Sequence, residues 1–139
     1  MGGRTKARKR ALDVLFEAEQ RHVEPRTVFL RVATDATSPL NPYTEELVDG
    51  VVAHRDHIDE LIATYAEGWS LDRMPAVDRN LLRIGVYELL YAHDVPATVA
   101  IDEAVGLASD LSTDESPAFI NGLLGRIASM QQRLSDVTD

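Results

Sequence analysis

Residues 77–91, with the sequence VDRNLLRIGVYELLY, form the stretch that decides the fold of this chain. Their apolar residues recur at spacings of three and four, which is the period of an α-helix. These positions are Val77, Leu81, Leu82, Ile84, Gly85, Leu89 and Leu90. Because they cover more than one face, we expect a helix that lies in the middle of the fold. Asp94-Val95-Pro96 ends this helix.

The segments on either side show the same helical spacing of apolar residues. They cover residues 7–18, 28–32, 47–52, 58–65, 101–111 and 120–127. Asn41-Pro42 and Ser116-Pro117 each place a capping side chain before a proline, which is a start signal for a helix. The sequence therefore predicts an all-α fold of about six to seven helices, packed as helical bundles in a single domain over residues 1–139.

Positive charge is concentrated in the first ten residues. They contain five of the chain's 14 Lys and Arg residues and none of its 23 acidic residues. The five cations are Arg4, Lys6, Arg8, Lys9 and Arg10, and we call residues 4–10 the basic head. An acidic body repels phosphates, so we expect nucleic acid to meet this protein at its basic end. A solvated tail without a binding role is the alternative that composition leaves open.

The basic head continues the helical pattern of the residues that follow it. Arg4 and Arg8 lie four residues apart, as do Lys6 and Arg10, so the charges fall on several faces of a helix. This segment has little apolar surface to bury. We therefore expect residues 1–10 to project from the body, or to stay frayed and flexible until an anion binds.

The composition narrows the class and location of the protein. The absence of cysteine excludes disulfides and thiolate metal sites, and it is compatible with a reducing cytosol. No apolar run approaches the ~20 residues that a membrane helix needs. Asp13, Glu17 and Glu19 interrupt the residues that follow the basic head, which argues against a signal peptide. We expect a cytoplasmic protein without a membrane partner.

Two clusters could suggest catalysis. His54 and His57 lie three residues apart among acidic neighbours, but no third ligand follows at a recognised zinc spacing. Serine residues near Ser116 have acidic neighbours but no histidine close in sequence and no nucleophile elbow, so caps and turns are the better interpretation. We expect no metal, no cofactor and no enzymatic activity. A metal-dependent hydrolase built on the two histidines remains as an alternative.

Phe119 is the aromatic residue that points most clearly to binding. It lies three residues after Ser116 and one before the apolar stripe that begins at Ile120. An aromatic side chain at the start of a helix could stack on a base of single-stranded RNA. Burial in the core is the alternative for Phe119, and Trp69 and Tyr91 are expected in the core or at its rim.

Several short motifs make the chain resemble the NusB transcription antitermination family over nearly its whole length. The motifs are Leu82-Arg83-Ile84, Tyr87-Glu88-Leu89, Asp94-Val95-Pro96, the stretch from Val99 to Val105, Ser116, and the stretch from Phe119 to Leu124. They follow the family's order and spacing. The opening from Lys6-Ala7-Arg8 to Leu15-Phe16 is similar to the arginine-rich first helix of that family.

This resemblance implies a fold of two small helical bundles and a role in transcription. Members of the family pair with NusE, a ribosomal protein of the small subunit, and the pair binds the boxA element of nascent ribosomal RNA leader transcripts. RNA polymerase that carries the assembled complex then passes terminators. A helical adaptor that binds only protein is the alternative function. Whether the free protein is a monomer or a homodimer stays open.

The resemblance also implies roles for individual residues. The basic head matches the segment of the family that contacts RNA, and Glu115 and Phe119 match positions placed near RNA. Phe16, Asp72 and Asp78 match positions on the side that faces NusE. The chain departs from the family at three positions. Asp102 stands where asparagine is frequent, Ala118 stands where a lysine often precedes the motif phenylalanine, and Phe16 replaces a tyrosine of some members.

Overall fold

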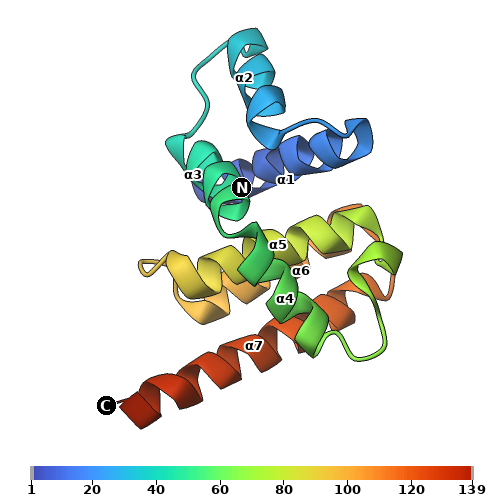
Figure 1. The fold of residues 1–139 in the computed structure, drawn as a ribbon. Helices are drawn as coiled ribbons and strands as arrows, with labels where there is room; N and C mark the ends of the chain where they lie inside the picture. Colours follow the sequence, from blue (N-terminus) through green and yellow to red (C-terminus); the bar gives the residue numbers. More distant parts are fainter. Residues whose placement is uncertain (1, 139) are drawn as a thin grey trace. The chain divides into compact units, whose positions relative to one another are not determined.

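The computed structural model describes residues 2–138, and within that range it contains seven α-helices and one short 3-10 helix (Figure 1). No strand occurs among these residues, so the prediction of an all-α fold with six to seven helices is confirmed. The elements are α1 (Gly3–Arg21), α2 (Pro25–Asp35), α3 (Pro42–Ala53), α4 (Arg55–Tyr65), η1 (Leu71–Arg73), α5 (Ala76–Tyr91), α6 (Ala97–Leu111) and α7 (Ser116–Thr138). In the described part of the chain, no helix has the length and apolar character needed to span a bilayer.

The helices form two compact units that divide between His54 and Arg55. The first unit contains α1, α2 and α3, and the second contains α4, η1, α5, α6 and α7.

In the first unit, α1 packs against both α2 and α3. Its core is built from side chains of all three helices that are almost fully buried, among them Ala11, Leu15, Val28 and Leu47. The predicted start of α3 is confirmed, because the Asn41 side-chain oxygen accepts a hydrogen bond from the Tyr43 N–H at 2.9 Å. This cap pairs one backbone N–H that the helix itself leaves free.

The structure of the basic head differs from the sequence-based expectation. The head neither projects nor frays, because α1 begins at Gly3 and includes every residue of the head. Ala7 and Arg8 are only 2% and 3% exposed, so the helix is buried along one side from its second turn onward. The apolar stripe of α1 extends through Ala7 into the head, and packing of this stripe holds the head in helical form.

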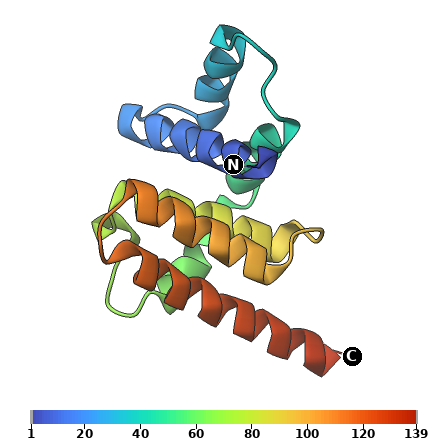
Figure 2. The ribbon, with the colours of Figure 1, turned by 180° about the vertical axis from the view of Figure 1, so that it is seen from behind.

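In the second unit, α5 is the central helix and contacts α4, α6 and α7. Residues 81–89 of α5 are all buried, which confirms the prediction for the stretch from Val77 to Tyr91 within this unit. Figure 2 shows α6 and α7 side by side, joined by a short turn. The close approach of α7 to α5 requires Gly85, because a Cβ atom there would lie 2.8 Å from Leu124 Cδ1.

An ion pair between the buried Arg83 and the partly exposed Asp59 joins α4 to α5. The Arg83 Nε donates to Asp59 Oδ1 at 2.8 Å, and Arg83 Nη2 donates to Asp59 Oδ2 at 3.1 Å. Two parallel hydrogen bonds of this kind fix direction as well as distance. The orientation of α4 on α5 is therefore set by polar contacts as well as by apolar packing.

Candidate nucleic-acid interface

The helical form of α1 sorts the five cations of the basic head into two groups. Arg8 is buried, and its guanidinium lies 5.6 Å from the centre of the Tyr43 ring. Arg4 is exposed and lies over the same ring at 4.2 Å. A cation over an aromatic face is attracted by the ring quadrupole. These two arginines therefore help to attach α1 to α3, and Arg8 is not positioned for contact with a ligand.

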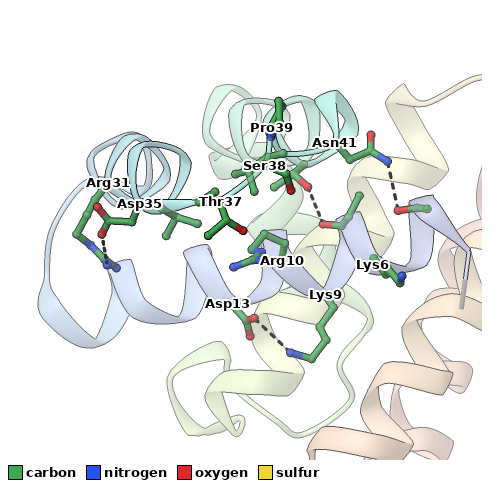
Figure 3. A pocket seen from close by; sticks show the side chains of 16 residues that line it. Lys6, Lys9, Arg10, Asp13, Arg31, Asp35, Thr37, Ser38, Pro39 and Asn41 are labelled. Carbon is green, nitrogen blue, oxygen red and sulfur yellow. Dashed lines mark hydrogen bonds and ion pairs between the residues drawn. The ribbon is translucent and has the colours of Figure 1, made fainter.

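The other three cations, Lys6, Lys9 and Arg10, line an open groove in the first unit (Figure 3). The groove has a volume of about 700 Å³. One side is α1, and the other side is the loop of residues 36–41 that joins α2 to α3. We call it the basic groove. It brings the cations of the head together with polar residues of the loop.

The loop end of the basic groove is tied to the first turns of α1. Asn41 Nδ2 donates to the Gly3 carbonyl at 3.3 Å, and Thr44 Oγ1 donates to the Ala7 carbonyl at 3.3 Å. Figure 3 shows the Asn41 side chain directed toward α1, with its hydrogen bond drawn as a dashed line. Asn41 thus caps α3 with its oxygen and contacts α1 with its nitrogen. These hydrogen bonds fix the position of the loop relative to α1 in the absence of a ligand.

Charge is distributed unevenly along the basic groove. Lys9 pairs with Asp13 at 3.3 Å, and Arg31 lies 3.8 Å from Asp35. Within residues 2–138, the structure shows no carboxylate in ion-pair distance of Lys6 or Arg10. In a chain with a formal charge of −9, two neighbouring cations without an acidic partner form an anion-attracting site.

Glu17 forms a small charge network beside this groove. Arg31 Nη2 donates to both of its carboxylate oxygens, at 2.6 and 2.7 Å, and Arg21 Nη1 donates to Oε2 at 2.8 Å. The hydrogen bond from Arg21, together with Arg31, holds the pKa of Glu17 below its ordinary value of 4.5. Glu17 therefore stays ionised and paired with Arg21 and Arg31. These two arginines offset its negative charge, so that Glu17 does not repel an anion in the groove.

In the second unit, Phe119 pairs with Trp69 at the protein surface. Their ring centres are 5.7 Å apart with a tilt of 39°, and Trp69 is 47% exposed. Phe119 is half-buried, so it is neither a core residue nor a fully exposed one. We call these two side chains the aromatic pair. Glu115 is exposed one turn earlier, and its carbonyl accepts the Phe119 N–H at 3.2 Å.

Sequence analysis missed the role of Trp69 in this pair. The only local signal is its position in the connector after Gly68, whose φ of 87° favours glycine. Trp69 follows this turn and belongs to none of the apolar stripes that form the helical core. Packing in the core therefore does not explain why a large aromatic residue stands there.

Asp78, which the resemblance placed on the side that faces NusE, is buried in the second unit. It is 3% exposed, and its carboxylate accepts hydrogen bonds from Ser112 Oγ at 2.5 Å and from Ser116 Oγ at 2.8 Å. The Thr113 N–H in turn donates to Ser116 Oγ at 3.2 Å. Asp78 therefore holds the turn between α6 and α7, which carries Glu115. Direct contact of its carboxylate with a partner does not fit this arrangement.

The other two residues expected on the side that faces NusE lie at the surface. Asp72 is exposed in η1, and Phe16 is 36% exposed on α1. The backbone around Asp72 is fixed by Arg79, whose Nη1 donates to the carbonyls of Leu71 at 2.7 Å and Met74 at 2.9 Å. Each residue therefore presents its side chain from a well-held segment.

The histidine cluster does not assemble a metal site in the part of the chain that the structure describes. No three His, Asp or Glu side chains gather there in a way that could hold a metal ion. His57 is exposed on α4, and His54 lies at the junction between the two units.

Comparisons of the sequence with known proteins all point to the NusB family. The model of the NusB family matches residues 5–129. The chain is 55% identical over 135 residues to the transcription antitermination protein NusB of Nocardioides sp., covering 97% of this chain and 100% of that protein. It is 58% identical over 135 residues to the transcription antitermination protein NusB of Arthrobacter sp., covering 96% and 98%.

Solved structures share the fold. T. maritima NusB is 35% identical, with a TM-score of 0.81, and the match covers 91% of this chain and 90% of that one. A chain from the structure of antitermination factors NusB and NusE in complex with dsRNA is 29% identical, with a TM-score of 0.83 and coverage of 94% and 98%.

Proposed function

Because the chain belongs to the NusB family, we propose that it acts as a transcription antitermination factor that binds boxA-type RNA together with NusE. The relatives named above are transcription antitermination proteins, and one of the matching structures combines NusB, NusE and RNA. The protein acts by binding and not by catalysis, and it works in the cytoplasm on transcripts that RNA polymerase is producing.

The basic groove supplies the contact with RNA phosphates, and it is the observation that best supports this function. Lys6 and Arg10 have no acidic partner among the described residues, although the chain as a whole is acidic. Arg4 lies exposed beside the same end of α1 and adds positive charge. Arg8 supports the helix from the buried side. Cationic contacts of this kind give affinity with little sequence information.

The aromatic pair supplies the contact with bases. Unstacked bases of single-stranded RNA bind to exposed aromatic faces, and Trp69 offers such a face beside Phe119. The carboxylate of Glu115 accepts hydrogen bonds, so it can select amino groups on base edges. Sequence preference arises here and in NusE, because phosphates are the same in every RNA.

NusE binds to the acidic surface that includes Asp72, and Phe16 adds an apolar contact. A ribosomal protein is basic, so a chain with a formal charge of −9 attracts it over a distance. We assign Asp78 a different role from these two residues. It positions the turn that carries Glu115, and it affects RNA binding through that turn.

The test is a gel shift with boxA RNA and a scrambled RNA of equal composition, each with and without NusE. We expect retention of boxA RNA in the presence of NusE. The variant Lys6→Ala with Arg10→Ala should lose this retention. Arg55→Ala with Arg133→Ala is the matched control, because it removes the same charge from exposed positions outside the groove.

Two outcomes would contradict the proposal. An adaptor that binds only protein would capture NusE but retain no RNA. A metal-dependent hydrolase would carry stoichiometric metal, which elemental analysis of the purified protein would detect.

A further inference from the structure

We propose that the loop of residues 36–41 is a ribose-recognising wall of the basic groove, and that it makes the protein prefer RNA to DNA of the same sequence. This proposal rests on the proposed function, because it concerns the same RNA and the same groove. It adds a second wall to the site and a chemical group that this wall recognises, the ribose 2′-hydroxyl.

The two walls of the basic groove carry different chemistry. Lys6 and Arg10 lie on the α1 side, four residues apart, so their Cβ atoms are ~5–6 Å apart on one helix face. Thr37 and Ser38 lie on the loop side. Figure 3 shows Arg10 between α1 and the loop that carries these two residues. One wall therefore offers positive charge, and the other offers hydroxyl groups.

The two hydroxyls are available for a ligand. Both residues are exposed, and within residues 2–138 the structure gives neither side chain a hydrogen-bond partner. Two other hydroxyls of the first unit are occupied: Thr34 donates to the Leu30 carbonyl at 2.8 Å, and Thr44 donates to the Ala7 carbonyl at 3.3 Å. The hydroxyls of Thr37 and Ser38 therefore line the same groove as the two cations without an acidic partner.

The chemistry of a ribonucleotide matches this arrangement. A nucleotide that places its phosphates on Lys6 and Arg10 directs its ribose toward the opposite wall. The 2′-hydroxyl both donates and accepts hydrogen bonds, as do threonine and serine hydroxyls. Deoxyribose lacks this group, so DNA would leave Thr37 and Ser38 without new partners. The loop can therefore contribute to RNA binding without contributing to DNA binding.

The size and lining of the groove also favour a nucleotide over a free phosphate ion. Its volume of about 700 Å³ lies within the ~300–1,000 Å³ that is usual for sites of small organic ligands. Val32 of α2, with Ala36 and Leu40 of the loop, adds apolar surface to the lining of the groove. A phosphate ion would use only the cations, whereas a nucleotide would also cover the apolar surface and reach the hydroxyls.

The loop wall is held in place before a ligand binds. Asn41 anchors its end to Gly3 by a hydrogen bond of 3.3 Å, and Pro39 restricts the backbone next to Ser38. A wall that is already ordered loses little conformational freedom on binding. The two hydroxyls are therefore already in position to distinguish ribose from deoxyribose when a ligand arrives.

The test compares RNA with deoxyribose versions of the same oligonucleotide that keep uracil, so that only the 2′-hydroxyls differ. Affinities of the full chain with NusE are measured by fluorescence anisotropy. We expect Thr37→Val with Ser38→Ala to weaken RNA binding about fivefold or more, and to change the affinity for the deoxyribose oligonucleotide by less than about twofold. Thr27→Val is the matched control, because it removes an exposed hydroxyl of α2 outside the groove, and both affinities should stay unchanged.

The outcomes separate this proposal from the proposed function. If the loop variant weakens binding to both oligonucleotides equally, or changes neither, the loop does not recognise ribose and the further proposal is overturned. In that case Lys6→Ala with Arg10→Ala should still weaken both. If the unchanged protein with NusE binds neither oligonucleotide, the proposed function itself fails. A thermal melt of each variant verifies that the fold is kept.

Discussion

The two units of the molecule are built from similar helices, but they use polar residues in opposite ways. In the first unit, the cations Lys6 and Arg10 face an open groove and lack an acidic partner among the described residues. In the second unit, the carboxylate of Asp78 and the guanidinium of Arg83 are buried and fully engaged. That unit instead exposes the aromatic pair. The difference suggests that one unit binds the RNA backbone and the other binds bases.

This difference has a physical basis. Charges exposed to water attract phosphates of any sequence, and their effect weakens with salt. Aromatic stacking holds an unstacked base in place, so that hydrogen bonds to its edge can distinguish one base from another, and this requires a surface held in one geometry. The buried hydrogen bonds of Asp78 supply such rigidity to the turn between α6 and α7. The comparison between the two units can be tested by changing each kind of residue in turn.

The largest effect is expected at Asp78. Alanine at this position removes the acceptor for Ser112 and Ser116, so Asp78→Ala should lower the free energy of unfolding by about 3 kcal/mol. Urea denaturation measures this loss. The control Asp72→Ala, at an exposed position, should change stability by less than ~0.5 kcal/mol. Equal effects of the two substitutions would show that the buried cluster is not what stabilises this turn.

The next effect concerns the two kinds of arginine in the basic head. Arg8→Ala should destabilise the protein by about 2 kcal/mol, because it removes a buried side chain beside Tyr43. Arg10→Ala should leave stability within ~0.5 kcal/mol and weaken RNA binding instead. Thermal melts and RNA titrations of both variants test this contrast. It would be contradicted if Arg10→Ala were the more destabilising substitution.

A smaller effect is expected for the aromatic pair. Trp69→Ala should reduce the preference for boxA over scrambled RNA by about 1–2 kcal/mol, because a base that is no longer stacked on this face also loses the hydrogen bonds that read its edge. The dependence of binding on salt should remain as it is. Competition titrations with the two RNAs, in the presence of NusE, give both quantities. Tyr91→Ala offers a comparison at a partly exposed aromatic residue outside the pair, and it should keep the preference.

The smallest effect is a dependence on pH in the first unit. The hydrogen bond from Arg21, with Arg31, lowers the pKa of Glu17 from its ordinary 4.5 in the folded protein. A lowered pKa means stabilisation that is present above pH ~4.5 and is lost as pH falls through the folded-state pKa. Glu17→Gln should therefore be less stable than the unchanged protein near pH ~7, and the difference should shrink as the pH falls below ~4.5. A difference that persists in acid would mean that the charge of Glu17 is not its cause.

Sequence analysis predicted those parts of the fold that depend on local patterns. The central helix α5 follows from apolar residues that cover more than one face, and the start of α3 follows from Asn41 and Pro42. Both features are encoded within a few residues. The assignment to the NusB family likewise rests on short motifs whose order and spacing are visible in the chain.

The candidate site was less predictable, because it depends on contacts between distant residues. The burial of Arg8 depends on which face of α1 meets Tyr43. Asp78 meets Ser112 and Ser116 across 34 and 38 positions of the sequence. No local pattern indicates such a contact, and the resemblance to the NusB family implied only that Asp78 matches a position on the side that faces NusE. The basic groove similarly requires the loop of residues 36–41 to lie against α1.

The most direct test of the division between backbone and base contacts is the salt dependence of boxA RNA affinity, measured with NusE for the unchanged protein and for Lys6→Ala with Arg10→Ala. If these cations contact two phosphates, the slope of log K against log salt should become shallower by roughly 1.4, at about 0.7 per contact. The preference for boxA over scrambled RNA should persist in this variant. An unchanged slope, or a loss of preference without a change in slope, would contradict the account.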